Sequence, residues 1–308
     1  MLLKGTLSLS RPPVIRFGDV SLRYVTQVKY LGITMSERMS FLLHFSVVRE
    51  KLTAVVGRVR RILRSDWGLS RRAVRTIYEG LFVACARFGS SVLTVVGKAR
   101  LLTCQRVAML ACMPVCHTVS TDALQVLLGA APLDLEVIRR GIAFKVKKGL
   151  PLHERDWIST SDVEGLDSRR TRLLLDSHLV TRWRSRWTDS PKGRTTFEFI
   201  PDATFVRERP DFGFSLSLGF LLTGHGSLNA FLHKRGLTDS PDCSCGRGVE
   251  DWLHVLTECS LYSDLRSLGD MGVFHTGVGW DCSRALEDRR TYSRLGEFAR
   301  CVFNRRRT

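Results

Sequence analysis

The stretch that decides the C-terminal fold is Cys243-Ser-Cys245-Gly246, followed by His254 and Cys259. Two thiols lie one residue apart, and Gly246 lets the backbone fold back directly after them. His254 lies in a predicted short helix, and Cys259 follows that helix. Three thiols and one imidazole make a complete tetrahedral donor set, of the kind that most often holds zinc. Because protein atoms would fill all four positions, the pattern predicts a structural zinc site and not a catalytic one.

The alternative is a chance cluster of three cysteines and a histidine in a buried, reduced segment. The first pair is closer than the spacer of about two to four residues found in standard zinc fingers. Residues 117–242 hold no cysteine, however, and three then follow within a short span with a histidine between them. This clustering favours the metal site.

The charge balance indicates a polyanionic partner. The chain of 308 residues carries 47 Lys and Arg against 30 Asp and Glu, a formal net charge of +17. Guanidinium groups pair with phosphates through a rigid fork, which favours nucleic acid over an acidic protein. Any one arginine cluster is more simply a solvated helix face, but the bias of the whole chain weakens that interpretation. The clusters are Arg58, Arg60, Arg61 and Arg64; Arg71, Arg72 and Arg75; Arg182, Arg184 and Arg186; and Arg305, Arg306 and Arg307.

The apolar runs and the cysteines indicate the compartment. The N-terminal residues lack the apolar core of a signal peptide, and no apolar run has transmembrane length. We therefore expect an intracellular, reducing environment without a membrane and, given the basic charge, a nuclear location. The cysteines outside the C-terminal cluster that fall in or beside apolar helical stretches are predicted to be buried core thiols; they are Cys85, Cys104, Cys112 and Cys116.

The hydrophobic pattern predicts a mainly α-helical fold with a small β portion. Two short strands flank a Gly18-Asp19 turn, and a third is predicted over residues 28–33. A polar, acidic stretch over residues 149–167 is the best domain boundary. Helices are predicted over residues 37–64, 70–83, 98–112, 121–129, 133–148, 168–187, 228–236, 250–257, 261–268 and 292–307, and a later strand over residues 195–200.

Two tryptophans in the arginine-rich helix leave two interpretations open. Trp183 and Trp187 alternate with Arg182, Arg184 and Arg186. Aromatic rings between arginines can stack on nucleic-acid bases. The same rings can equally pack inward against a core, and the sequence favours neither.

Motifs for catalysis are missing from the sequence. It has no Asp-Asp dipeptide, no Gly-x-Ser-x-Gly, no His-Glu-x-x-His and no dinucleotide-binding glycine pattern. A two-metal polymerase or nuclease site needs converging carboxylates, and the acidic residues here are scattered. The residues alone therefore support a nucleic-acid-binding protein with a structural zinc and no complete active site.

Several segments, in the expected order, resemble one family. The C-terminal cluster with Ser260-Leu261-Tyr262 resembles the zinc knuckle of non-LTR retrotransposon polyproteins, above all the type-1 elements that insert into arthropod ribosomal RNA genes. Lys29-Tyr30-Leu31-Gly32-Ile33 looks like the primer-grip strand at the end of a reverse-transcriptase palm. Further similar segments are Trp67-Gly68-Leu69-Ser70, residues 77–86, Ser120-Thr121-Asp122-Ala123-Leu124, Pro132-Leu133-Asp134-Leu135-Glu136, residues 191–196 and residues 221–226.

The resemblance implies the C-terminal fragment of an RNA-directed DNA polymerase polyprotein. In that family, palm aspartates bind two magnesium ions and an endonuclease domain lies further upstream. By this likeness the chain starts just before the primer grip and lacks both, so it would be inactive alone and magnesium would belong only to the full-length polymerase. The implied domains are the last palm strands (1–36), a thumb-like helical region (37–150), a basic linker domain (151–242), a CCHC zinc knuckle (243–260) and C-terminal helices (261–308).

The resemblance also implies partners. Lys29, Tyr30, Leu31 and Gly32 would help seat the primer terminus, and the basic helices would grip template–primer phosphates. The knuckle would help bind element RNA or target DNA, and the missing palm and endonuclease parts would be protein partners. The alternative is a free-standing or domesticated zinc-knuckle protein that binds nucleic acid without catalysis. The target site and the preference for RNA or DNA stay open.

Overall fold

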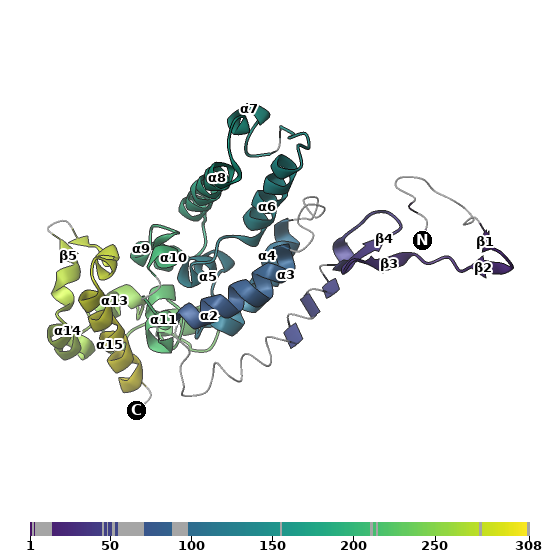
Figure 1. Cartoon of the computed structure of the whole chain (residues 1–308). Helices are drawn as coiled ribbons and strands as arrows, with labels where there is room; N and C mark the ends of the chain where they lie inside the picture. The colour runs from purple at the N-terminus through teal and green to yellow at the C-terminus, as the bar shows by residue number, and fades with distance from the viewer. Residues whose placement is uncertain are drawn as a thin grey trace.

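The computed structural model describes residues 1, 3, 14–44, 46–47, 49–50, 53–54, 71–87, 98–154, 156–209, 212–213, 215–276 and 279–306. Within these residues the chain is mainly helical, as the sequence predicts, and its strands form three separate two-stranded sheets. Figure 1 shows the helices gathered in one body and the two N-terminal hairpins extending away from it. The assignment of these parts as palm and thumb stays a prediction.

The helical elements follow the predicted order closely. Of the helix predicted over residues 37–64, short pieces between residues 42 and 54 are helical, and most of the remainder lies outside the described residues. A π-helical segment, Tyr78–Val83, interrupts the second predicted helix. The α-helices are α2 (Arg71–Ile77), α3 (Ala84–Arg87), α4 (Lys98–Cys112), α5 (Thr121–Leu128), α6 (Leu133–Lys147), α7 (Thr160–Val163), α8 (Ser168–Asp189), α9 (Arg194–Phe199), α10 (Phe205–Glu208), α11 (Leu216–Thr223), α12 (Asn229–Lys234), α13 (Trp252–Thr257), α14 (Ser263–Gly269) and α15 (Arg289–Arg305).

The first hairpin forms where the sequence predicts it. β1 (Ile15–Phe17) pairs antiparallel with β2 (Val20–Leu22) across the Gly18-Asp19 turn. Its apolar side chains are exposed, and Phe17 is 82% exposed. A two-stranded ribbon of this kind buries no core of its own.

The second hairpin replaces the single strand predicted over residues 28–33. β3 (Gln27–Tyr30) pairs with β4 (Ile33–Ser36), so the prediction of one continuous strand is wrong. The turn is Leu31-Gly32, and both residues have positive φ, 47° and 84°. Two consecutive positive φ angles match the two-residue turn whose twist fits a hairpin. Gly32 accepts that conformation freely, whereas Leu31 holds it at a steric cost.

Helix α5 lies at the centre of the helical body. The Ser120 side chain accepts a hydrogen bond from the backbone N–H of Ala123 at its start, and Gly129 ends it in the left-handed conformation at φ 69°. Leu124, Val126 and the rest of its second half are buried. A Cβ atom on Gly129 would lie 2.8 Å from the backbone nitrogen of Arg207, so glycine also permits the close approach of α10.

The two tryptophans of α8 pack inward. Trp183 and Trp187 are each 1% exposed, and Trp187 Nε1 donates a hydrogen bond to the carbonyl oxygen of Ile200. Of the two interpretations left open by the sequence, the core position is therefore the one observed. The rings leave no face free for a base.

The strand predicted over residues 195–200 is wrong, because these residues form helix α9. The β-branched and aromatic residues there suggest a strand by propensity. In the structure Thr196 and Phe199 are buried, and the Phe199 ring lies 5.0 Å from the Trp252 ring. Tertiary packing therefore outweighs local preference, and it joins α9 to α13.

Residues 149–167 connect α6 to α8, two helices that pack against each other. A small core joins Ile142 of α6 and Leu175 of α8 to Ile158 of the connection. The main core, by contrast, extends from Phe41 to Phe303. The division into domains at residues 149–167 stays a prediction.

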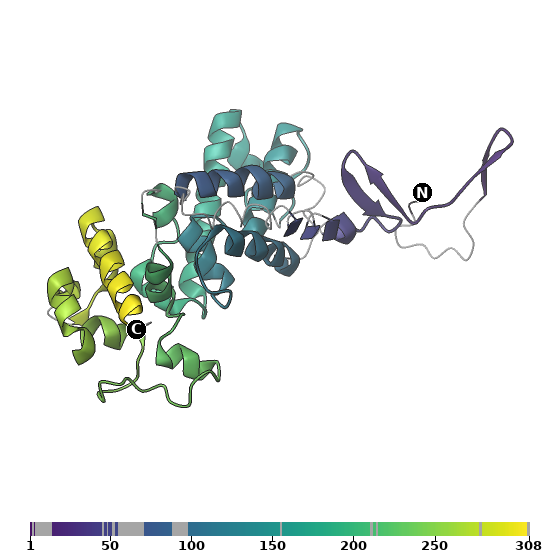
Figure 2. The same cartoon turned by 90° about the horizontal axis from the view of Figure 1, so that it is seen from below.

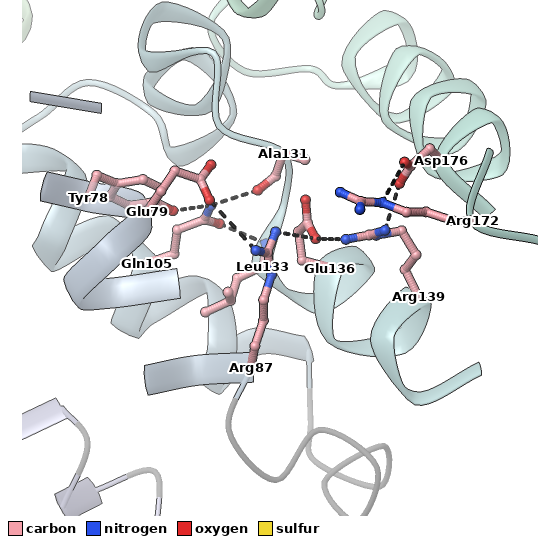
Figure 3. A network of polar contacts seen from close by, with 10 residues as sticks. All are labelled: Tyr78, Glu79, Arg87, Gln105, Ala131, Leu133, Glu136, Arg139, Arg172 and Asp176. Atoms are coloured by element: carbon pink, nitrogen blue, oxygen red, sulfur yellow. Dashed lines mark hydrogen bonds and ion pairs between the residues drawn. The ribbon is translucent and has the colours of Figure 1, made fainter. Parts of the chain in front are cut away.

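A polar network links α3, α4, α6 and α8 inside the body (Figure 3). Gln105, which is fully buried, donates to the Tyr78 hydroxyl and to the Ala131 carbonyl, and its own side-chain oxygen accepts from the Leu133 N–H. Beside it, Arg87 and Arg139 both pair with Glu136. Buried polar groups are stable only when they are paired in this way.

The C-terminal helices pack at the end of the molecule opposite the hairpins. Figure 2 shows the yellow α15 beside the green segments that precede it, far from the purple hairpins. The rings of Phe220 and Phe303 meet at 5.3 Å, which joins α11 to α15. Strands β5 (His275–Thr276) and β6 (Gly279–Trp280) form the third sheet.

The described cysteines are free thiols. Cys104 is buried, and Cys112 and Cys116 are half-buried against the main core, close to the prediction of core thiols. Burial raises the pKa of the Cys112 thiol to about 11. The side chain of Cys85 lies outside the described set.

Candidate metal centre

The four predicted ligands come together at one point. One donor atom from each of Cys243, Cys245, His254 and Cys259 lies within 4.8 Å of every other. The Sγ atoms of Cys243 and Cys259 are 3.5 Å apart, and Cys245 Sγ is 3.2 Å from Nε2 of His254. Cys245 is half-buried and the other three residues are buried. This is the compact donor set that the sequence predicts.

A tight turn places the first two thiols. The Cys243 N–H donates to the Gly248 carbonyl at 2.7 Å, and the Gly246 N–H donates back to the Cys243 carbonyl at 2.9 Å. Gly246 has a φ of 75°, which glycine adopts without strain. The Arg247 N–H points at Cys245 Sγ at 3.4 Å. Backbone N–H groups aimed at a sulfur stabilise its thiolate form.

Helix α13 places the other two ligands. The Asp251 carboxylate accepts from the His254 N–H at 2.8 Å and so caps the start of the helix. The Cys259 N–H donates to the His254 carbonyl at the helix end, which returns that thiol to the cluster. His254 Nδ1 lies 3.9 Å from Glu258. Nε2 is therefore the ring nitrogen that faces the thiols and could bind the metal. A carboxylate behind a ligating imidazole is a common outer partner in metal sites.

The electrostatics of the three thiols differ. At Cys245 burial raises the pKa, but hydrogen bonds from Arg247, Cys243 and His254 outweigh it and lower the pKa to about 6. Burial raises the pKa of Cys243 to about 12 and also raises that of Cys259. Of the three thiols, that of Cys245 therefore ionises most easily. Three sulfurs and one imidazole nitrogen are the donors that suit zinc, so the residues present fit this metal.

Comparison with known proteins places the whole chain. It is 48% identical over 100% of its length to the putative 115 kDa protein in type-1 retrotransposable element R1DM of Drosophila melanogaster, and covers 30% of that protein. It is 45% identical to a retrovirus-related Pol polyprotein from element R1 of Bradysia coprophila, of which it covers 31%. A Pol polyprotein from element R1 3 of Nasonia vitripennis is 38% identical, and the chain covers 84% of it.

The chain belongs to the Pol polyproteins of type-1 retrotransposable elements. It spans about a third of the length of the Drosophila and Bradysia relatives. No family model and no solved structure matches it. Among the described residues of this Pol-family chain, no helix has the length and apolar character needed to cross a membrane.

The residues predicted to seat a primer lie on the second hairpin. Lys29 and Tyr30 end β3, and Leu31 and Gly32 form its turn. Tyr30 is 62% exposed and Leu31 is 76% exposed. An exposed ring and an exposed aliphatic side chain at a hairpin tip are open to a partner.

The predicted arginine contacts fall into three groups. Arg58, Arg60, Arg61 and Arg64, with the side chain of Arg71, lie outside the described residues. Arg72 is exposed on α2, and the exposed Arg182 lies over the Trp157 ring at 5.2 Å. Arg184 pairs with Asp202 at 2.9 Å, and Arg186 pairs with both oxygens of Asp134 at 2.8 Å. The last two are therefore engaged inside the chain.

The structure also gathers basic residues that the sequence analysis did not single out. Lys192, Lys234 and Arg235 line one open groove with His225 of the Thr-Gly-His-Gly turn. Lys192 lies far along the chain from the adjacent Lys234 and Arg235, and no local spacing connects the two positions. Only the excess of basic residues over the whole chain hinted at such a surface.

Proposed function

We propose that this chain is the nucleic-acid-binding C-terminal part of an RNA-directed DNA polymerase polyprotein. The observation that carries the proposal is its match, over its full length, to Pol polyproteins of type-1 retrotransposable elements. The formal charge of +17 suits a polyphosphate partner. Polymerisation, its magnesium ions and endonuclease cleavage belong, in this proposal, to other parts of the full-length polyprotein. The comparisons do not favour a free-standing binding module.

The metal centre serves as a structural zinc site in this proposal. Cys243, Cys245, His254 and Cys259 would hold the ion, and zinc would supply folding free energy to a segment with little core of its own. The segment would help to present the C-terminal part to element RNA or target DNA. Its four protein donors leave no position for a reacting water.

Primer and template contacts are assigned to the second hairpin and to the arginine clusters. Lys29, Tyr30, Leu31 and Gly32 would meet the primer terminus, since Tyr30 and Leu31 are exposed at the hairpin tip. Arg58, Arg60, Arg61, Arg64, Arg71 and Arg72 would contact template–primer phosphates, and Arg182, on the face of α8, would add a further contact. Arg184 and Arg186 would have to exchange their carboxylate partners for phosphate, so we expect them to contribute least. Since its target DNA would be chromosomal, the polyprotein would act in the nucleus.

Metal analysis tests the zinc site. We expect about one zinc per purified chain. Cys243→Ser should lose it and melt at a lower temperature, because structural zinc contributes directly to folding. Cys301→Ser is the matched control, since Cys301 is exposed and lies outside the cluster. Unchanged zinc content and melting in Cys243→Ser would overturn the assignment.

Binding assays test the rest of the proposal. Affinity for nucleic acid should fall steeply with salt, because neutralised phosphates release counterions. A chain that binds neither RNA nor DNA at about 0.1 M salt would refute the proposed function. Primer extension by this chain alone would refute the assignment of polymerisation to other parts of the polyprotein.

A further inference from the structure

One large groove lies between the metal-bearing segment and the helical body. Its volume is about 1360 Å³, above the range of about 300–1,000 Å³ typical of small-molecule sites. Its walls come from the first half of α4, the turn before α5, the connection from α8 to α9, the turn between α11 and α12, α12 itself, and the start of α13. A groove of this size and openness suits a polymer more than a metabolite.

Three arginines build the walls of the groove. Arg106 donates to the carbonyls of His117 and Val119, and Arg194 donates to those of Thr188 and Ser190. Arg186 is held by Asp134, as described above. Arg106 and Arg194 therefore hold loop backbone in place, and Arg186 is held in an ion pair, so all three side chains are engaged within the chain.

Four further cations at the groove are exposed and have no hydrogen-bond or ion-pair partner for their side chains among the described residues. They are Lys98, Lys192, Lys234 and Arg235.

The three carboxylates at the groove are occupied. Asp122 accepts from Ser190 at 2.7 Å, Asp189 accepts from Ser185 at 3.1 Å, and Asp251 caps α13. Seven basic side chains line the groove against these three carboxylates, so the groove presents an excess of positive charge to whatever enters it.

An aromatic pair lies in the same groove. The rings of His225 and Phe231 have centroids 4.6 Å apart at an interplanar angle of 32°, and both residues are half-buried. Thr118 Oγ1 lies 2.7 Å from His225 Nδ1 and fixes the ring. Burial, aided by the charges of Lys234, Arg235 and Arg106, lowers the pKa of His225 to about 4. The imidazole is therefore a neutral aromatic surface at physiological pH.

We propose that this groove binds a single strand of nucleic acid, with its phosphates against Lys192, Lys234 and Arg235 and one unpaired base stacked on the Phe231–His225 pair. The inference rests on the proposed function and locates one of its contact surfaces. A duplex buries its base faces in its own stack, whereas a single strand offers them to aromatic side chains. Cations along a groove and a ring within it are the two features that single-strand sites combine.

The metal centre borders this groove directly. Trp252 lines the groove and lies two residues before the ligand His254 on α13. The Ala230 N–H at the start of α12 donates to the Glu250 carbonyl, and the Asn229 side chain donates to the Asp242 carbonyl next to Cys243. Loss of the metal should therefore displace one wall and weaken strand binding.

Fluorescence anisotropy with a labelled single strand of mixed sequence, as RNA and as DNA, tests the proposal. Lys234→Ala/Arg235→Ala should lower the slope of log affinity against log salt by about 1.4, at about 0.7 for each phosphate contact on a single strand. If the difference vanishes near about 1 M salt, affinity at about 0.1 M should fall about 25-fold. Phe231→Leu keeps the apolar contact but removes the ring, and should weaken binding about five-fold or more.

The matched control is Arg169→Ala/Arg170→Ala. These arginines are exposed at the far end of α8, which spans 22 residues and so about 33 Å. They carry the same charge, and their loss should leave affinity nearly unchanged. Equal losses in both double variants, or tighter binding of duplex than of single strand, would overturn the groove while the proposed function still held. No binding by the wild type would instead refute the proposed function itself. Preference for RNA or for DNA identifies the natural strand.

Discussion

Glu136 is the central carboxylate of the ion-pair chain in Figure 3, and Glu136→Gln tests what that chain contributes. Its Oε2 atom lies 2.8 Å from Arg87 and 3.2 Å from Arg139, and its side chain is 8% exposed. Glutamine keeps the shape of the side chain and a hydrogen-bond acceptor but removes the charge. The substitution therefore isolates the electrostatic part of the interaction.

The expected cost follows from the partners that remain. Removing one partner of a buried ion pair costs about 3–5 kcal/mol. Here both arginines keep a second carboxylate, since Arg139 lies 2.6 Å from Asp176 and Arg87 lies 3.9 Å from Glu79. Arg87 is also 28% exposed, so water screens part of its charge. We expect Glu136→Gln to lower the free energy of unfolding by about 2 kcal/mol at neutral pH.

The same effect should depend on pH. At Glu136 burial raises the pKa, but the charges of Arg139 and Arg87 outweigh burial and hold it below the ordinary value of 4.5. The unfolded chain therefore binds this proton more tightly than the folded chain does. The stabilisation is complete above pH 4.5 and is lost as the pH falls through the lower pKa of the folded state. The difference in the free energy of unfolding between wild type and variant should therefore become smaller in that acidic window.

Urea denaturation followed by far-ultraviolet circular dichroism, at neutral pH and in the acidic window, measures both effects. Glu297→Gln is the control, because its pair with Arg300 is 3.6 Å long and its side chain is 72% exposed. Exposed pairs contribute about 0–1 kcal/mol, so this variant should unfold nearly as the wild type does. A Glu136→Gln protein that unfolds at the same urea concentration as the control at neutral pH would refute the reasoning.

Three further predictions concern buried groups and the metal. Gln105→Leu should lower the free energy of unfolding by about 3 kcal/mol, because the Ala131 carbonyl and the Leu133 N–H lose their buried partner; a melting temperature equal to wild type would contradict this. Gly129→Ala should lower the melting temperature more than Gly165→Ala does. Both glycines have positive φ, 69° and 70°, but only at Gly129 would the new Cβ atom lie against backbone atoms. Equal decreases in melting temperature would exclude this clash. A zinc chelator should lower the melting temperature and expose three more thiols to a thiol reagent, and unchanged thiol reactivity would count against the metal centre.

The metal ligands could be found from the sequence because they lie close together along the chain. The turn at Gly246 and the short helix at His254 are local structures, and their residues place the thiols without help from distant segments. The helix predicted over residues 121–129 forms as α5, and its caps are local too, since Ser120 and Gly129 each act within one turn of a helix end. Contacts between residues that are close along the chain are the ones that sequence analysis predicts best.

Two local predictions failed for different reasons. The segment of α9 has the propensity of a strand, yet Phe199 is drawn into contact with Trp252, which lies far away along the chain. The stretch predicted as one strand over residues 28–33 contains a turn, and that turn depends on Leu31 adopting a conformation that leucine rarely takes. Residue propensities predict neither the contact of Phe199 with Trp252 nor the turn at Leu31.

The partners of the charged side chains were the hardest feature to predict from the sequence. The formal charge describes the chain as a whole, whereas the engagement of each arginine depends on folding. Arg186 meets Asp134 from 52 positions away, whereas Lys192, Lys234 and Arg235 stay without a carboxylate partner among the described residues. Separating structural arginines from available cations therefore needs the tertiary arrangement.

The cluster of thiols and imidazole can also be regarded as a cross-link. It ties Cys243 to Cys259, 16 positions apart, and closing a loop of that length removes about 3 kcal/mol of conformational entropy from the unfolded chain. A disulfide would do the same, but a reducing compartment would open it. Arg306 near the end of the described chain reaches back to Glu250 inside this loop. The metal supply would thus control the stability of this loop and of its contact with Arg306, with no change in redox state.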